Sequence, residues 1–378
     1  MAEIDVVMSV FNTAKYLPNT LKSIQNQTVD DIRIIIIDDG STDNTRDILT
    51  KAQESDPRII YQYQENAGIV AAVNAGMQLC TAPFIARHDG DDISAPFRFE
   101  KERAYLLANE DCVAVSALAR HIDETGKAMG TTTRAKDMSL VDDSALPANE
   151  PYILQPLLMM RRDAFMKTGG YRLLTIGEDT DLYWRMTKIG NLHIIPEVLG
   201  DYRIHPDSIS SQSIVSGRRM SAWAQLSALS AQRLRKNLPD IHFTPELQEK
   251  IDSQIEMVEL FRVIEPIMRE DEKAWFYSAM AAKLIEACYY RPFEPLQSDI
   301  DYIRSVPLMD KNVSSRRFYD SYEQGILSAG IRMAIDGRLS DALRLVPRRQ
   351  WPKLIGRIMF RIVVSQKVKD RMKTILRK

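Results

Sequence analysis

A short apolar run that ends in two acids is the feature that most constrains the fold of this 378-residue chain. Residues 33–37 are an arginine and four isoleucines, and Asp38 and Asp39 come next, before the turn-forming residues 40–43. A β-branched run of this length is too short for a buried helix and is typical of an interior strand of a parallel sheet. Because ligands bind beyond the carboxyl ends of such strands, the two acids stand where a ligand site is expected.

A second strand with acids at its carboxyl end is predicted further along the chain. Residues 82–86 have the strand pattern, and Asp89 and Asp91 follow with Gly90 between them. The glycine lets the backbone bend and a ligand approach closely. Carboxylate oxygens suit Mg2+ or Mn2+, which proteins usually hold with one or two carboxylates plus the phosphates of a substrate. The alternative is ordinary turn and cap chemistry, because a helix is expected to start near Pro96.

Residues near these strand ends indicate a nucleotide. Phe11, at the end of the first predicted strand, could stack on a nucleobase, and the Asp39 carboxylate could accept the imide N–H of uracil or thymine. This pairing favours a pyrimidine nucleotide. Structural alternatives stay open: Phe11 as a core aromatic residue and Asp39 as the acceptor of an Asx turn, although Asp38 is the better candidate for a structural role. Arg87 could reach a phosphate as a planar donor or be a solvated arginine.

Glu178 and Asp179 form a second pair of acids. They precede an apolar pattern of helical spacing that begins just after Asp181, so they lie at a predicted helix N-terminus. The helix dipole stabilises ionised acids there, and capping alone would explain them. His205 follows a strand-like segment. Its imidazole could be an additional metal ligand or a phosphate contact, or an ordinary surface or core histidine.

Several classes of protein are excluded by missing motifs. The chain has neither a P-loop nor an early dinucleotide-binding fingerprint. Its three cysteines, Cys80, Cys112 and Cys288, lack metal-ligand spacing and indicate a reducing compartment. No stretch reaches the roughly 18 uncharged apolar residues that span a bilayer, and the first apolar run is the first strand rather than a secretion signal. A cytoplasmic location is therefore expected.

The order and spacing of these motifs resemble those of the family 2 glycosyltransferases, enzymes of the GT-A fold. The resemblance covers the first 210 residues, a little over half of the chain. The matching segments are residues 6–12, 38–43, 66–68, 74–76, 87–92, 169–171, 178–179 and 202–205. It implies an α/β fold with a GT-A, Rossmann-like nucleotide-binding domain whose sheet is mixed and mainly parallel.

The resemblance also implies the roles of the donor-side residues. Asp39 contacts the base, Asp89 contacts the ribose or the donor sugar, and Asp91 holds the Mn2+ or Mg2+ ion that bridges the two phosphates. His205 is a further candidate ligand of this metal. The ion matters because a nucleoside diphosphate is a poor leaving group until its developing negative charge is neutralised.

On the acceptor side, the resemblance implies that Asp179 is the general base. A positioned carboxylate that takes the proton of a sugar hydroxyl as attack begins contributes typically ~10²–10⁴-fold. In-line displacement on the far face of the donor sugar then inverts the anomeric centre. Glu178, Gly169, Gly170 and Tyr171 are expected to line the acceptor pocket, where the glycines allow a sugar ring to approach closely.

The remainder of the chain is expected to be mostly α-helical. After a nucleotide-binding domain over residues 1–215, the alternation of strands and turns stops, and residues 216–343 show long helical patterns with breaks at prolines. Residues 344–378 form a basic tail. It contains 12 Lys or Arg and one acid, a net charge of +11, which leaves −12 for the rest of a chain whose total is −1.

The basic tail has the composition of an amphipathic helix that lies on a membrane surface. One helical face carries Leu354, Ile355, Ile358, Met359 and Ile362, and another carries Lys353, Arg357 and Arg361. An anionic lipid surface attracts such a segment by about 1 kcal/mol per nearby basic residue. The alternatives are a terminal helix packed on the body and a nucleic-acid patch, which the lack of base-stacking aromatics disfavours. We therefore expect peripheral attachment to the inner face of the cell membrane and no nucleic-acid partner.

The expected function is metal-dependent, inverting transfer of a sugar, most simply from a UDP-sugar, to a hydroxyl of a glycan or lipid-linked glycan, as in bacterial surface-polysaccharide assembly. Two other functions stay open. One is a non-catalytic nucleotide-binding scaffold of a polysaccharide assembly complex, although no acid has been lost from the motifs. The other is nucleotidyl transfer to a sugar phosphate, which normally has a Gly-rich, Arg/Lys-containing loop where this chain has residues 11–15.

Overall fold

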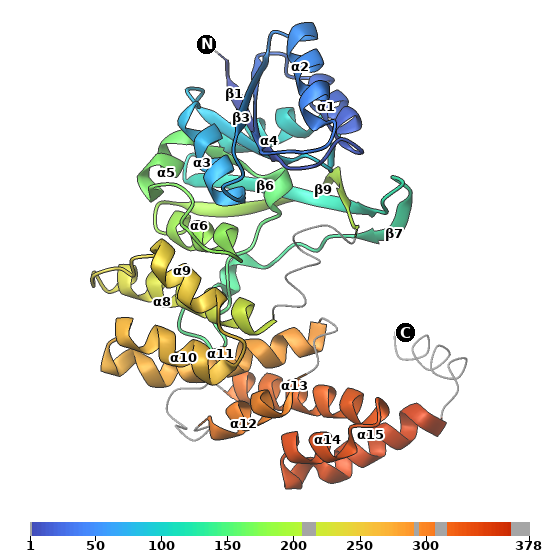
Figure 1. Cartoon of the computed structure of the whole chain (residues 1–378), viewed down its shortest axis with the longest axis vertical. Helices are drawn as coiled ribbons and strands as arrows, with labels where there is room; N and C mark the ends of the chain where they lie inside the picture. Colours follow the sequence, from blue (N-terminus) through green and yellow to red (C-terminus); the bar gives the residue numbers. More distant parts are fainter. Residues whose placement is uncertain (1, 206–216, 291–294, 307–315, 364–378) are drawn as a thin grey trace. The chain divides into compact units, whose positions relative to one another are not determined.

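The computed structural model describes residues 2–205, 217–290, 295–306 and 316–363 (Figure 1). The chain divides into two compact units. The first consists of Met1–Asp143, Asn149–Gln212 and Ser230–Gln248, and the second of Ser144–Ala148, Ser213–Leu229 and Glu249–Lys378. Residues 230–248 thus cluster with the first unit, although their sequence pattern is helical like that of the region after residue 215.

The first unit is built on a nine-stranded sheet that is mixed and mainly parallel, as expected. Its strands are β1 (Ile4–Val10), β2 (Ile32–Asp39), β3 (Ile59–Gln64), β4 (Phe84–Asp89), β5 (Ile93–Ser94), β6 (Cys112–Ile122), β7 (Ala128–Thr132), β8 (Met159–Arg161) and β9 (Asn191–Arg203). They are ordered β3-β2-β1-β4-β8-β6-β9-β5, with β7 paired to β6. β1 to β4 run parallel to one another and β6 runs parallel to β9, whereas β8 is antiparallel to both of its neighbours.

The isoleucines of β2 show why this strand has a continuous apolar sequence. Ile34 and Ile36 belong to the core on one face of the sheet, and Ile35 and Ile37 belong to the core on the other face. All four side chains are at most 1% exposed. Because helices cover both faces, neither set of alternating side chains can be polar.

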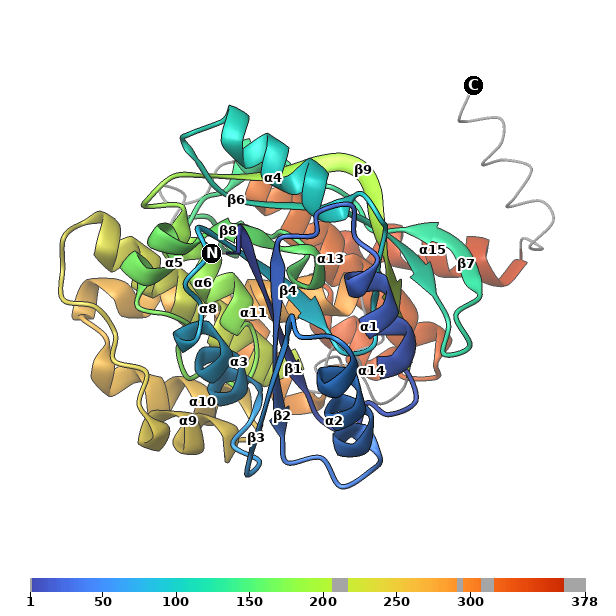
Figure 2. The same cartoon turned by 90° about the horizontal axis from the view of Figure 1, so that it is seen from above.

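Helices form a layer on each face of this sheet (Figure 2). The core on one face includes residues of α1 (Leu17–Gln25), α2 (Thr45–Ser55) and α4 (Arg98–Ala108). The core on the other face includes residues of α3 (Ile69–Gln78), α5 (Arg162–Thr168) and α6 (Glu178–Met186). The acids of α6 therefore lie in a helix that is fixed to the sheet by its own buried side.

The acidic strand ends meet at one edge of the sheet. Asp38, at the end of β2, pairs with Val10, the last residue of β1. Asp89, at the end of β4, pairs with Ser9 of the same strand β1. Both acids thus stand at the carboxyl ends of the two strands that flank β1, as expected. Gly40 follows with a φ of +82°, and a Cβ there would lie 2.7 Å from the Asn66 backbone nitrogen. Only glycine allows the two loops to approach this closely.

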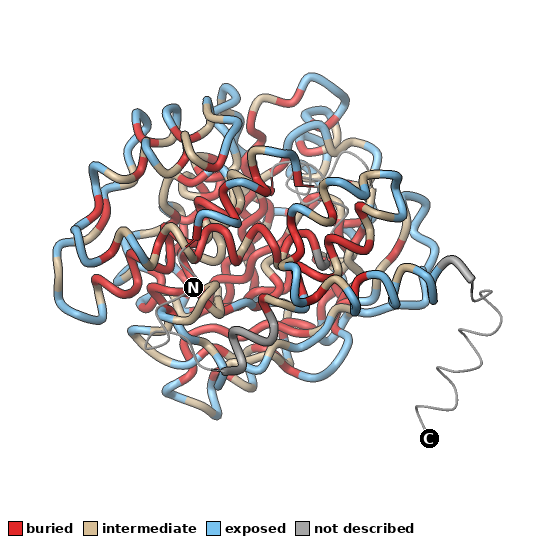
Figure 3. Tube along the Cα trace, turned by 90° about the horizontal axis from the view of Figure 1, so that it is seen from below, coloured by how far each residue is buried: buried red, intermediate tan, exposed pale blue. Residues whose placement is uncertain are grey.

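The rest of the described chain is helical, as predicted. Its helices are α8 (Gly217–Arg235), which contributes to both units, α9 (Pro245–Asp252), α10 (Met257–Ile264), α11 (Glu270–Tyr290), α12 (Gln297–Ser305), α13 (Arg316–Ile335), α14 (Leu339–Leu345) and α15 (Trp351–Val363). Short 3₁₀ turns occur at Met138–Leu140, Gln155–Leu157, Glu265–Ile267 and Arg348–Gln350. Buried and exposed residues alternate along the helices, the pattern of amphipathic packing (Figure 3). Within the described ranges, no helix combines the length and the apolar character that crossing a bilayer requires.

Candidate functional site

The two acids that end β2 have different surroundings. Asp38 is fully buried, and its carboxylate accepts hydrogen bonds from the Ser41 backbone N–H at 2.8 Å and the Tyr61 hydroxyl at 3.2 Å. Asp39 is 4% exposed. Its carboxylate accepts from the Gln64 amide at 2.7 Å and from the backbone N–H groups of residues 67 and 68, both at 2.9 Å. A carboxylate has about four acceptor positions, so Asp39 keeps one for a ligand.

Phe11 lies just beyond the end of β1. It is 49% exposed, which excludes the alternative of a core aromatic residue. The next residue, Asn12, has a φ of 52°, and its Oδ1 accepts the Thr42 backbone N–H at 2.8 Å. Asn12 therefore ties the loop after β1 to the loop after β2. This arrangement leaves the Phe11 ring accessible beside the strand that ends in Asp39.

Asp91 and His205, far apart in the sequence, meet in the structure. His205 Nε2 lies 2.8 Å from Asp91 Oδ2, and the side chains are 9% and 23% exposed respectively. Within the described residues, no group of three or more His, Cys, Asp or Glu side chains could hold a metal ion. A carboxylate and an imidazole this close together could both be ligands of one ion, and proteins usually complete the coordination of Mg2+ with phosphate oxygens of a substrate.

Burial and crowding raise the pKa values of the acids that flank Asp91. At Asp89 burial is the main cause, and the Arg87 guanidinium opposes it. At Asp92 burial, followed by the charges of Asp91 and Asp89, raises the pKa well above its ordinary value. A bound cation would favour the ionised forms of clustered carboxylates like these. The electrostatics of this loop thus fit Mn2+ or Mg2+.

Arg87 lies beneath the loop of residues 89–92 rather than at its surface. Its side chain is fully buried and donates to the Val7 carbonyl at 2.8 Å, the His88 carbonyl at 3.3 Å and Asp89 Oδ1 at 3.0 Å. The alternative of a solvated arginine is therefore wrong. With these bonds in place, Arg87 orients the Asp89 carboxylate, and a direct phosphate contact would require the side chain to move.

Glu178 and Asp179 occupy the first turn of α6, which follows Gly177 with a φ of +81°. Burial raises the pKa values of both acids, and the charge of Asp179 raises that of Glu178 further. At Asp179 the rise is opposed by Thr180, whose backbone N–H and hydroxyl lie 2.6 and 3.3 Å from Oδ1. The charge of Asp89 also contributes to the raised pKa of Glu178. The α6 acids and the β4 acid are thus within electrostatic reach of each other.

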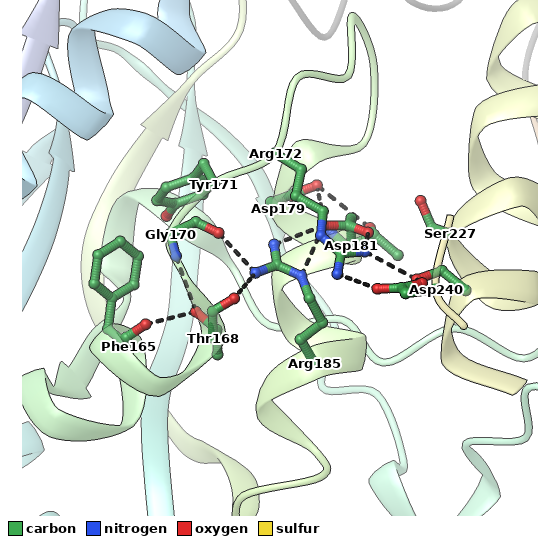
Figure 4. Close-up of polar contacts among 12 residues, drawn as sticks. Phe165, Thr168, Gly170, Tyr171, Arg172, Asp179, Asp181, Arg185, Ser227 and Asp240 are labelled. Carbon is green, nitrogen blue, oxygen red and sulfur yellow. Dashed lines mark hydrogen bonds and ion pairs between the residues drawn. The ribbon is translucent and has the colours of Figure 1, made fainter. Parts of the chain in front are cut away.

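Arg185 fixes the turn before the α6 acids (Figure 4). It donates to the carbonyls of Thr168 and Gly170 at 2.8 and 2.7 Å and to Asp181 Oδ2 at 2.6 and 3.0 Å. Gly169 and Gly170 have φ values of +78° and +88°, so this turn needs glycine at both positions. The Arg185–Asp181 pair is buried and connects the turn to the helix that carries Asp179.

Tyr171, the next residue of the same turn, is held by Asn74 of α3. The Asn74 side chain donates to the Tyr171 carbonyl at 2.8 Å and accepts the Tyr171 N–H at 3.0 Å. The ring is 5% exposed, and its buried hydroxyl has no hydrogen-bond partner among the described residues. A buried hydroxyl without a partner is available to a ligand.

Sequence reasoning assigned no role to Asn74, Asp181 or Arg185. Asp181 and Arg185 are spaced i, i+4 at a predicted helix, which is a signal for an ion pair. Nothing in the sequence connects Asn74 to Tyr171, because they are 97 positions apart.

Comparisons with known proteins identify what this chain is similar to. The family model described as glycosyl transferase family 2 matches residues 5–169. The O-antigen biosynthesis glycosyltransferase WbnJ of Escherichia coli is 30% identical over 218 residues, 56% of this chain and 83% of that protein. The amylovoran biosynthesis glycosyltransferase AmsE of Erwinia amylovora is 28% identical over 214 residues, 55% and 78% of the two chains. An uncharacterized glycosyltransferase of Nostoc is 31% identical over 211 residues, 54% of this chain and 65%, just under two thirds, of that one.

A solved structure shares the fold. S. aureus TarS 1–349, in complex with UDP-GlcNAc, matches with a TM-score of 0.51 at 14% identity, and the match covers 93% of this chain and 92% of that one. The fold is therefore of the GT-A type expected from the motifs.

Proposed function

Because this chain belongs to glycosyltransferase family 2 and is a glycosyltransferase, we propose that it transfers a sugar from a UDP-sugar to a hydroxyl of a glycan or lipid-linked glycan, with inversion of the anomeric carbon. The convergence of two acid pairs supports this proposal most: Asp89 and Asp91 at the end of β4, and Glu178 and Asp179 at the start of α6. Burial and the charge of Asp179 raise the pKa of Glu178, and the charge of Asp89 adds a smaller contribution. A donor site and an acceptor site built on these pairs would be adjacent.

On the donor side, the exposed ring of Phe11 would stack on uracil, and the remaining acceptor position of Asp39 would take the imide N–H. TarS, which shares this fold, binds UDP-GlcNAc. Asp91 and His205 would hold a Mn2+ or Mg2+ ion together with the diphosphate. When bound there, the ion neutralises the charge that develops on the leaving UDP. Asp89, oriented by Arg87 at 3.0 Å, would receive the ribose or sugar hydroxyls.

On the acceptor side, Asp179 would remove the proton of the attacking hydroxyl. The hydroxyl oxygen bonds to the anomeric carbon as the bond from that carbon to UDP breaks on the opposite face, so the configuration inverts. A raised pKa makes the ionised Asp179 carboxylate a stronger base. Glu178 and the fixed turn at residues 169–171 would bind the acceptor and orient the hydroxyl. The O-antigen and amylovoran relatives support a surface glycan as the acceptor.

A screen of nucleotide sugars tests this proposal. Each is incubated with the full chain and Mn2+, and the released nucleotide product is identified. Release of UDP from a UDP-sugar, lost on addition of EDTA, is the expected result. Release of pyrophosphate would instead indicate a nucleotidyltransferase, and release of neither would indicate a scaffold.

The basic helix α15 supports a location at the inner face of the membrane. Leu354 is fully buried near Gly330 of α13, so one side of α15 is packed. Ile355 and Met359 are each 54% exposed, and Phe360 is 44% exposed. The outward-facing residues therefore include apolar ones, next to the exposed cations Lys353, Arg357 and Arg361. The structure describes the backbone but not the side chains of Ile362 and Val363, and residues 364–378 lie outside the described ranges.

Sedimentation with vesicles tests this location. Wild-type protein should sediment with vesicles that contain phosphatidylglycerol and much less with vesicles of phosphatidylcholine alone. The double change Ile355→Asp with Met359→Asp should remove most of the binding. Leu107→Asp on α4, where the leucine is 56% exposed, is the matched control and should bind like wild type. Equal binding by the double variant and wild type would contradict the location.

A further inference from the structure

A hollow separate from the proposed transfer site lies on the α1 side of the first unit. Its volume is about 590 Å³, within the range of small-molecule sites. It is lined by the residues before and along α1, by β5, by the end of β6 and the turn after it, and by the end of β9. None of the residues that we assign to the nucleotide, the metal, the acceptor or the general base lines it.

Two of the cations that line this hollow are not paired with an acid of its lining. Lys15 is paired with Glu124 at 3.1 Å, and Asp201 is paired with Arg120 at 2.9 Å. Both lining acids are thus already neutralised. Lys22 and Arg203 line the same hollow, and neither forms an ion pair with an acid in the described part of the chain. The charged side chains that line the hollow are therefore positive in sum.

Arg203 has an unused donor group at this hollow. The residue is 5% exposed, and its guanidinium lies over the Tyr16 ring, 4.6 Å from the centroid. Nε donates to the Asp91 carbonyl at 2.7 Å and Nη1 to the Asp123 carbonyl at 3.0 Å. Nη2 makes no hydrogen bond to any described residue. A rigidly held guanidinium with a free amino group is suited to a carboxylate or a phosphate.

The neutral lining of the hollow suits a sugar ring. Asn19 and Asn26 carry amides that both donate and accept, and Ser23 carries a hydroxyl. The Tyr16 ring offers an apolar face. The volume exceeds what a single phosphate or carboxylate group would fill. The combination of cations, amides and an aromatic ring matches a sugar that bears an acidic group.

We propose that this hollow binds an acidic sugar unit of a glycan, with its carboxylate or phosphate facing Lys22 and Arg203. The inference rests on the proposed function, because the glycan would be the chain that the enzyme extends. The hollow would bind the glycan at a point away from the transfer centre. It also borders the loop of residues 89–92 without including Asp91 or His205, since Arg203 of its lining donates to the Asp91 carbonyl and the Tyr16 ring lies 5.1 Å from the ring of His205.

Ligand-observed NMR on the full chain tests the site with glucuronate, glucose 6-phosphate and neutral glucose as probes. At least one acid should bind about tenfold more tightly than glucose, and the better acid identifies the group as a carboxylate or a phosphate. A saturating concentration of UDP with Mn2+ should not displace the bound acid. Lys22→Glu should weaken binding of the acid about tenfold or more, whereas Lys51→Glu, the same change at an exposed lysine of α2, should not.

Four results would overturn the proposal: no binding of either acid, equal binding of glucose, displacement by UDP, or equal effects of the two lysine changes. The proposed function fails on a separate measurement, calorimetry of UDP with Mn2+. Lys22→Glu should leave UDP binding at the wild-type level. If wild-type protein does not bind UDP, the donor assignment is contradicted, whatever the sugar probes show.

Discussion

The acids at the end of β4 and the acids at the start of α6 are chemically alike but have different neighbours. Asp89 lies 3.0 Å from the Arg87 guanidinium, and Asp91 lies 2.8 Å from the His205 imidazole. Glu178 and Asp179 form no ion pair within the described ranges. The hydrogen bonds that Asp179 accepts come from Thr180 in its own helix turn.

This difference separates the two roles that a carboxylate can take in a transferase. A carboxylate that is hydrogen-bonded to a guanidinium or an imidazole has a fixed orientation, as a ligand of a metal or a hydroxyl must. A carboxylate whose pKa is raised by burial, with no ion-pair partner, is a better proton acceptor once ionised. The surroundings rather than the residue type therefore support the proposed division, with the donor role at β4 and the base role at α6.

Asp179→Asn is expected to have the largest effect, on turnover alone. Without the proton acceptor, kcat should fall by about 10²–10⁴-fold, while calorimetry should show nearly unchanged binding of UDP with Mn2+. Asp163→Asn makes the same chemical change at an α5 carboxylate that is 71% exposed, and it should have no effect. Wild-type turnover by the Asp179 variant would remove this residue from the base role.

Asp91→Asn tests the other acid pair and should weaken binding of the donor nucleotide. Calorimetry should show that UDP binding in Mn2+ weakens by at least about tenfold, the scale on which metal-site changes act. Removing the metal with EDTA should bring wild-type protein down to the level of the variant and should leave the variant unchanged. Metal-dependent UDP binding of wild-type strength in the variant would contradict a metal role for Asp91.

Glu178→Gln distinguishes the two acids within α6. The pKa of Glu178 is raised by burial and by the charge of Asp179, so a neutral amide resembles the form that the raised pKa favours. The variant should therefore lose less than about tenfold in kcat, well below the effect of general-base removal. A loss as large as that of Asp179→Asn would exchange the roles of the two acids.

Thr180→Val should have the smallest effect, on pH dependence. Burial raises the pKa of Asp179, so kcat should fall as the pH drops through a value above the ordinary aspartate pKa of about 3.9. The Thr180 hydroxyl favours the ionised form, and its removal should move this acid limb to higher pH by less than about one unit. A limb that stays in place or moves to lower pH would show that another group controls it.

The sheet could be predicted from the sequence because its signals are local. The isoleucines of β2 and the glycine turn after Asp39 specify a buried strand and its end within ten positions, and register then follows from neighbouring strands of the same kind. Helix α6 is specified in the same way, by apolar spacing that starts just after Asp181.

The surroundings of the site residues could not be predicted because they depend on contacts between distant segments. Arg87 is buried because β4 pairs with β1, which brings the Val7 carbonyl to within 2.8 Å of its guanidinium. His205 and Asp91 are 114 positions apart. On α15 the sequence pattern indicates an amphipathic helix but does not reveal that Leu354 packs inward while Ile355 faces out.

A crystal of this protein soaked with UDP and Mn2+ tests the central claim most directly. Anomalous scattering should locate the manganese within bonding distance of the Asp91 carboxylate and the diphosphate, with uracil stacked on Phe11 and hydrogen-bonded to Asp39. Manganese bound away from Asp91, or a base bound away from Phe11 and Asp39, would contradict the account.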